Sequence, residues 1–71
     1  MGPSALTAKI KSKMALDDRV SARAIDVDTS GSVVTLRGVV RSKDERDRAV
    51  RLARETQGIT RVIDHLRVAS N

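Results

Sequence analysis

Residues 24–41 contain the pattern that most restricts how this chain can fold. They form two runs of alternating apolar and polar residues, joined by a short turn. In the first run, residues 24–29, Ile25 and Val27 alternate with two aspartates; Ser30-Gly31 is a turn signal, and residues 32–41 alternate again. Two such runs around a Gly-containing turn predict a β-hairpin. One face of this hairpin is apolar, so another part of the chain must pack against it.

The second run defines the two faces of the hairpin. The residues expected to point inward are Val34, Leu36, Gly38 and Val40. The residues expected to point outward are Val33, Thr35, Arg37, Val39 and Arg41. A glycine inside a strand favours close approach of another backbone, and Gly31 suits a turn with positive φ.

A helix is predicted before the hairpin. Ser4 is its expected cap, and the helix runs to about Ala15 or Leu16. Its apolar residues recur every four positions and form a narrow stripe: Leu6, Ile10 and Met14. The sequence Asp-Asp-Arg at residues 17–19 ends this pattern, and Val20 is expected to be buried as the chain leaves the helix.

A second helix is predicted after the hairpin. Ser42 and Glu45 have the spacing of a capping box, so the helix is expected to begin at Lys43. Gly58 suits a left-handed C-terminal cap, which places the helix end one or two residues before it. The residues expected on its buried face are Ala49, Ala53 and Thr56.

Residues 59–68 predict a third strand, with Val62, Leu66 and Val68 in one phase and Ile63, His65 and Arg67 in the other. A strand–helix–strand unit crosses over right-handed, which makes the third strand parallel to the second. The predicted fold is therefore α+β, a two-layer α-β-β-α-β sandwich. Two helices pack on one face of a mixed three-stranded sheet, and the other face is open.

The charges of the second helix are expected to cancel. Asp44 stands four residues before Arg48, and Asp47 four before Arg51, which is the favourable orientation for helical ion pairs. Residues 43–57 sum to +1, although Arg46 and Arg54 lack partners at this spacing and remain open as ligand contacts.

The chain carries 14 Lys and Arg against 9 Asp and Glu, a net charge of +5. The unopposed basic residues lie in the first helix: Lys9, Lys11 and Lys13. They can simply keep an amphipathic helix soluble. Alternatively, joined by Arg19 or Arg23, they form a contact surface for anionic head groups, to which each Lys contributes about 1 kcal/mol.

Several functional classes lack support in the composition. The chain has no aromatic residue on which nucleic-acid bases could stack, and no GxxG loop. It has no Cys and a single His, His65, which is expected on the open face beside the inward-pointing Asp64. No catalytic residue, metal site or cofactor is therefore expected, and nucleic-acid binding is the least favoured function.

The spacing of these residues resembles that of the BON domain, the bacterial OsmY and nodulation domain. The resemblance covers about residues 6–68. It is carried by Ile25-x-Val27, by Gly31-x-Val33-x-x-Leu36-x-Gly38-x-Val40, by Ala49 and Ala53, and by Gly58-Ile59-x-x-Val62 leading to Leu66-x-Val68. Ile10 and Asp17 also match, whereas Asp64-His65 stands where the family commonly has Asn.

The resemblance implies the same order of elements and a non-catalytic module of the bacterial envelope or periplasm that contacts anionic phospholipid. Residues 1–5 are then a start or cloning remnant, residues 6–68 a single domain and residues 69–71 a tail. The sequence shows neither an export signal nor an apolar run long enough for a membrane helix, so a cytoplasmic location stays open.

The open sheet face offers an alternative function. Exposed aliphatic residues among arginines are typical of a protein contact, with a second domain, a partner or another copy. The residues expected to form it are Val33, Arg37, Val39, Ile63 and Arg67. We nevertheless expect the isolated domain to be a monomer.

Overall fold

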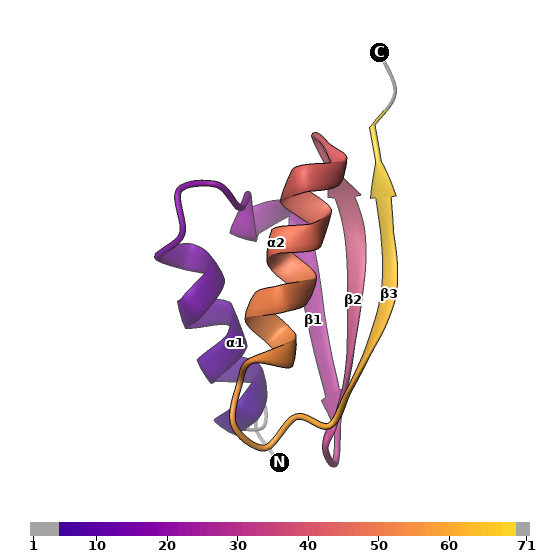
Figure 1. Cartoon of the computed structure of the whole chain (residues 1–71). Helices are drawn as coiled ribbons and strands as arrows, with labels where there is room; N and C mark the ends of the chain where they lie inside the picture. The colour runs from indigo at the N-terminus through magenta and orange to yellow at the C-terminus, as the bar shows by residue number, and fades with distance from the viewer. Residues whose placement is uncertain (1–4, 70–71) are drawn as a thin grey trace.

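The computed structural model describes residues 5–69 and confirms the predicted α+β class and order of elements (Figure 1). Its elements are α1 (Ala5–Ala15), a short 3₁₀ turn η1 (Ala22–Ala24), β1 (Ile25–Ser30), β2 (Val33–Val40), α2 (Lys43–Arg54) and β3 (Arg61–Val68). Ser4, the predicted cap of the first helix, lies outside the described residues.

The sheet has the predicted mixed topology. Its strand order is β1-β2-β3, with β1 antiparallel to β2 and β2 parallel to β3. Both helices lie over one face of the sheet, α1 beside α2, and no element covers the opposite face within the described residues (Figure 1). The domain therefore has a closed helix side and an open sheet side.

Aliphatic side chains from every element fill the space between the two layers. Burial follows the predicted phases: the inward residues of β2 are buried, and α2 buries Ala49 and Ala53 toward the sheet. The core consists of Ile10, Met14, Val20, Ile25, Val27, Val34, Leu36, Val40, Ala49, Ala53 and Leu66. The small residues of α2 let that helix lie close to the strands.

The structure shortens two predicted elements. Helix α2 ends at Arg54 instead of continuing to residue 56 or 57, because the amide of Thr56 turns back to bond to the carbonyl of Ala53 at 3.2 Å. Strand β3 begins at Arg61 instead of residue 59. Thr60 donates its amide to the carbonyl of Ser32 at 2.8 Å, which fixes the start of β3 beside the hairpin turn.

The predicted capping box is only half correct. The hydroxyl of Ser42 accepts the amide of Glu45 at 3.1 Å, as expected for a helix N-cap. The carboxylate of Glu45, however, does not return to Ser42. It is buried and accepts the amide of Arg41 at 2.7 Å, a contact that joins the end of β2 to the first turn of α2.

Gly38 marks the place where two backbones come closest. Its φ of +133° is a conformation that side-chain-bearing residues rarely adopt. A Cβ atom at this position would overlap the carbonyl oxygen of Ala24 and lie 3.3 Å from the Cα of Ile25. The close approach predicted from a glycine inside the strand is thus confirmed, and it places η1 against β2.

Replacing Gly38 with Ala is expected to lower the free energy of unfolding by about 2–3 kcal/mol, because the new methyl group meets rigid backbone and the φ angle is strained. Urea denaturation followed by circular dichroism measures this. Gly31→Ala is the matched control. Gly31 has a φ of +61°, but its Cβ would meet nothing within 4 Å, so about 1 kcal/mol is expected. Equal losses in the two variants would contradict the close approach at Gly38.

Candidate functional site

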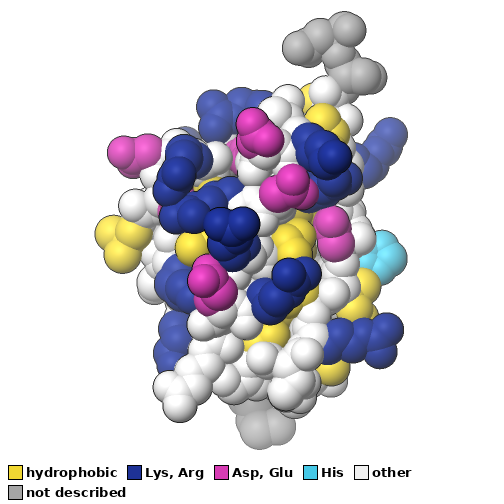
Figure 2. Space-filling view, in the orientation of Figure 1, with side chains coloured by type: hydrophobic (Ala, Val, Ile, Leu, Met, Phe, Trp, Pro, Cys, Tyr) yellow, Lys and Arg dark blue, Asp and Glu magenta, His cyan; other side chains and the backbone are white. Residues whose placement is uncertain are grey.

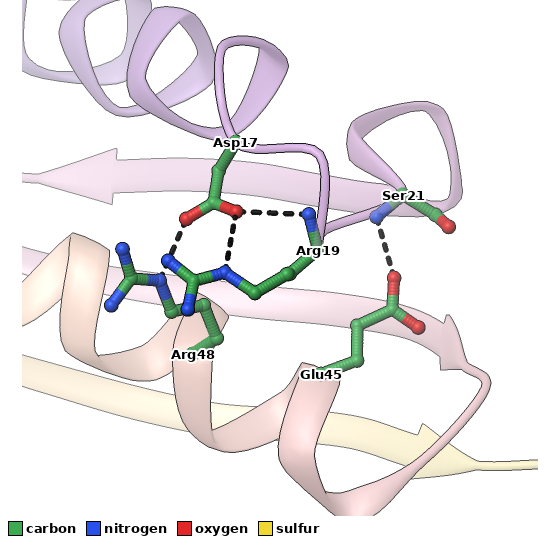
Figure 3. A network of polar contacts seen from close by, with 5 residues as sticks. All are labelled: Asp17, Arg19, Ser21, Glu45 and Arg48. Carbon is green, nitrogen blue, oxygen red and sulfur yellow. Dashed lines mark hydrogen bonds and ion pairs between the residues drawn. The ribbon is translucent and has the colours of Figure 1, made fainter.

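Two carboxylates hold the segment between α1 and β1 in place (Figure 3). The first is Asp17, at the end of α1. One of its oxygens accepts the Nε of Arg48 on α2 at 2.6 Å, and the other accepts the amide of Arg19 at 2.9 Å. The hydrogen bond from the Arg48 side chain, followed by that from the Arg19 amide, lowers the pKa of Asp17 from its ordinary value of 3.8 to about 2.

The second carboxylate is Glu45, in the first turn of α2. It accepts the amide of Ser21, the residue before η1 (Figure 3). It also accepts the amide of Arg41, so it ties α2 to the end of β2 as well. Burial alone would raise the pKa of this carboxyl group. The amides of Arg41 and Ser21 outweigh that effect and lower the pKa from 4.5 to about 2.

These contacts determine where the predicted lipid-binding arginines lie. Arg19 follows Asp17 directly; its side chain is 70% exposed and touches Asp17 at 3.3 Å. Arg23 lies in η1 and is exposed. Both guanidinium groups are therefore accessible to solvent although their backbone is fixed.

Lys13 differs from the other two lysines of the predicted cluster. Its ammonium group donates to the carbonyl of Leu52 at 2.9 Å and to the hydroxyl of Thr56 at 3.1 Å. It thus binds the C-terminal turn of α2, where a cation is favourable beside unpaired carbonyl groups. Lys13 is half-buried, and its charge stabilises the packing of α1 on α2.

Lys9 and Lys11 are exposed. Each is one residue from the buried Ile10, so at 100° per residue they lie on opposite borders of the solvent-facing side of α1. That side carries small, exposed, uncharged residues: Ala8, Ser12 and Ala15. No acidic residue interrupts α1 (Ala5–Ala15).

Lys11 and Arg23 line the same groove, between α1 and the β1 edge of the sheet. Its volume is about 390 Å³. The remaining lining is largely apolar and comprises Met14, Ala15, Ala22, Ile25, Asp26 and Val27. Two of the five predicted lipid-binding residues thus line one hollow, which combines two basic side chains and the carboxylate of Asp26 with aliphatic groups.

Leu16 was not among the predicted site residues, yet it is the most exposed large apolar residue of the described chain, at 85%. It lines a second, more open hollow together with Arg19 and Lys13. The sequence contained a usable signal. Leu16 lies outside the stripe of Leu6, Ile10 and Met14, so a helix that buries the stripe must leave Leu16 in solvent.

The charges of α2 cancel, but through partners that the sequence did not indicate. Arg48 pairs with Asp17 instead of Asp44. Arg46 contacts Asp47 at 3.6 Å and Asp64 of β3 at 3.8 Å. Neither expected helical pair forms: Arg48 reaches another element, and within the described residues Arg51 belongs to no ion pair. Asp64, which required a partner in its inward phase, has one in Arg46.

Acidic side chains are interleaved with the basic ones over α2 (Figure 2). Arg46 is half-buried and occupied by two carboxylates, which makes it a poor ligand contact. Helix α2 is therefore a charge-compensated surface, and the structure gives no reason to place an anion site on it.

The structure brings the five predicted protein-contact residues onto the open face of the sheet. Val39 is 52% exposed, and Val33 and Ile63 are half-buried. Arg37 lies beside His65, and Val39 beside Arg67, in the β2–β3 register. These residues alternate along β2 and β3 with the residues that face the core, so they lie on the sheet face that the helices leave uncovered.

The described residues also limit other kinds of site. Over residues 5–69, no three His, Cys, Asp or Glu side chains come together in a way that could hold a metal ion. In the same range, neither helix is long and apolar enough to cross a bilayer.

Comparison with known proteins assigns the family. The chain matches the family model of the BON domain over residues 4–70. The chain therefore belongs to the BON domain family. It is also 40% identical over 68 residues to the osmotically-inducible protein Y of Escherichia coli strain K12, which covers 96% of this chain. The chain spans 34%, about one third, of that relative.

The two fixed carboxylates predict how stability depends on pH. Since folding lowers the pKa of Asp17 and of Glu45 to about 2, the folded state releases protons that the unfolded state holds. Their contribution is complete above pH 4.5 and is lost as the pH falls toward 2. The urea midpoint is expected to drop over this range, and Glu45→Gln is expected to be less stable at pH 7 and to drop less on acidification.

Ser42→Ala provides the control for this pH series. It removes the uncharged cap of α2 and lowers stability by about 1 kcal/mol. Its dependence on pH should parallel that of the wild type. A Glu45→Gln variant with the full wild-type loss between pH 4.5 and 2 would show that the Glu45 carboxylate does not stabilise the fold.

Proposed function

We propose that this domain binds peripherally to membranes that contain anionic phospholipid, through α1 and the segment up to η1. The observation that carries the proposal is the groove shared by Lys11 and Arg23, with its aliphatic lining. A phospholipid head group presents a phosphate to basic side chains and, directly beneath it, apolar chains. The groove offers groups that complement both.

The outer side of α1 supports contact along the length of the helix. Ala8, Ser12 and Ala15 carry no charge and are small, so they let the helix lie close to a surface. Lys9 and Lys11 border this side and can place their ammonium groups among lipid phosphates while their methylene stems stay near the helix. The absence of acidic residues in α1 removes repulsion from an anionic surface.

Leu16 adds an apolar contact at the end of α1. An exposed leucine beside Arg19 has the chemistry of a residue that enters the boundary between head groups and acyl chains. Lys13 has no part in this surface because its ammonium group is bound to α2. The proposed lipid-contact residues are thus Lys9, Lys11, Leu16, Arg19 and Arg23.

The comparisons support a role in the bacterial envelope under osmotic stress. The relative of 40% identity is named for its induction by osmotic conditions. The resemblance to BON domains implies a non-catalytic module associated with the envelope. We extend the envelope location and the non-catalytic role to this chain. A surface with so few charges binds weakly on its own, so several linked domains would bind a membrane more tightly than one.

Lys11→Gln with Arg23→Gln tests the groove. Removing two charges of about 1 kcal/mol each is expected to weaken binding to phosphatidylglycerol-containing vesicles roughly 30-fold. Co-sedimentation with vesicles measures this, at low salt and at 0.5 M salt, where binding should largely disappear. Vesicles of phosphatidylcholine alone should bind neither protein.

Lys43→Gln with Arg54→Gln is the matched control, since both residues are exposed on α2 and the change in net charge is identical. It should leave vesicle binding within about threefold of the wild type. An equal loss in both double variants would mean that only net charge matters. Binding to phosphatidylcholine as strong as to phosphatidylglycerol would contradict the proposal.

Leu16→Ser tests the apolar contact. Because Leu16 is 85% exposed, the substitution should leave the free energy of unfolding nearly unchanged. Vesicle binding is expected to weaken about fivefold, for partial burial of the leucine at about 1 kcal/mol. Val39→Ser, at another exposed apolar residue on the opposite layer, is the control. No difference between the two variants would exclude insertion of Leu16.

A further inference from the structure

The open face of the sheet is sorted by charge from one edge to the other. The strand register places three rows of side chains across it: Asp26–Arg37–His65, Asp28–Thr35–Ile63 and Ser30–Val33–Arg61. Val39 and Arg67 form the start of a fourth row. Column by column, β1 carries the two aspartates, and β3 carries Arg61, His65 and Arg67.

The acidic and basic columns are too far apart to neutralise each other within one molecule. They are separated by β2, and two strand spacings amount to about 10 Å. The outer charges, Asp26, Asp28, Arg61 and Arg67, are exposed. Over residues 5–69, none of them belongs to an ion pair. Each column therefore presents charge to solvent.

Two valines, Val33 and Val39, lie on β2 between the two columns, together with Thr35 and the exposed Arg37. Val39 is half in solvent, and Val33 and Ile63 are partly exposed, since the helices cover only the other face. A surface with one acidic edge and one basic edge brings opposite charges together when one copy is turned so that the edges exchange.

Two copies can pack face to face about either of two simple two-fold axes. Only one of these axes sets the acidic edge of one copy against the basic edge of the other. A two-fold axis perpendicular to the strands would set β1 on β1 and place Asp26 and Asp28 against aspartates. A two-fold axis parallel to the strands sets β2 on β2 and β1 on β3. Asp26 then faces His65 of the second copy, Asp28 faces Ile63, which stands between His65 and Arg61, and Ser30 faces Arg61. The charges thus select the axis.

We propose that the domain forms a weak, reversible homodimer in which the open sheet faces of two copies pack together about a two-fold axis parallel to the strands. Two sheets packed in this way have nearly aligned strands, as in β-sandwiches. Arg37 lies near the axis, opposite its own counterpart. Each of these guanidinium groups is flanked by Asp26 in its own row and approached by Asp26 of the second copy.

This proposal departs from the monomer expected from the sequence, and it does not rest on lipid binding. The sequence placed the aliphatic residues and arginines on one face, but the separation of acid and base into opposite edges follows from the register. Helix α1 lies on the other layer (Figure 1). Failure of vesicle binding therefore leaves the dimer intact, and the reverse also holds.

Sedimentation equilibrium with interference optics tests the dimer, because the chain has no aromatic residue for absorbance at 280 nm. The wild type is expected to dimerise with a Kd between about 10 µM and 1 mM. Asp26→Lys with Asp28→Lys makes both edges basic, and Arg61→Asp with Arg67→Asp makes both edges acidic. Each double variant should dimerise at least about tenfold more weakly.

A mixture of the two double variants gives the decisive result. The basic β1 edge of one variant then faces the acidic β3 edge of the other, and at the second edge the unchanged acidic β1 faces the unchanged basic β3. A heterodimer should therefore form about as tightly as the wild-type dimer. Lys9→Asp with Lys43→Asp, two exposed changes on the helix layer, is the charge-matched control for the acidic variant and should leave the Kd within about twofold.

Two results would overturn the proposal. One is a wild type that stays monomeric at about 1 mM, which would assign the open face to a different partner. The other is a mixture that associates no better than its components, which would show that any dimer uses another surface. Circular dichroism of each variant confirms that the helices and strands are retained in every comparison.

Discussion

The carboxylate of Glu45 joins three parts of the chain that are distant in sequence. It belongs to the first turn of α2, accepts the amide at the end of β2, and accepts the amide of Ser21 before η1. Because a buried carboxylate without donors would be strongly unfavourable, these amides must stay where they are for the domain to fold. Asp17 makes a parallel connection from α1 to α2. Together they position the segment that carries Arg19 and Arg23.

Much of the fold was predictable because its elements follow simple patterns. Alternation in residues 24–41 predicted the hairpin, and Gly38 indicated a close backbone approach. The spacing of four in the first helix correctly placed Ile10 and Met14 in the core, but Thr7 is buried and Leu6 only half-buried. Helix and strand ends were less predictable. The start of β3 depends on a hydrogen bond from Thr60 to Ser32, which is far away in sequence and which local patterns do not contain. The end of α2 depends on the tightened turn from Thr56 to Ala53, which the position of Gly58 did not indicate.

The surface chemistry was harder to predict, since each charged residue can choose among partners on several elements. Lys13 looked identical to Lys9 and Lys11 in the sequence, but only Lys13 reaches the last turn of α2. Arg48 has Asp44 one helical turn away on α2, but its ion pair is with Asp17. Glu45 was recognised as a capping residue, whereas its burial was not, although it continues the face formed by Ala49 and Ala53.

The division of the domain into a helix layer and an open sheet determines how a dimer would be oriented on a membrane. The two layers form opposite sides of the domain, because both helices lie over the same face of the sheet (Figure 1). If sheets pack on sheets, the two α1 helices point away from each other. Such a pair cannot lay both helices on one flat bilayer. It would work as a spacer that crosslinks two apposed lipid surfaces.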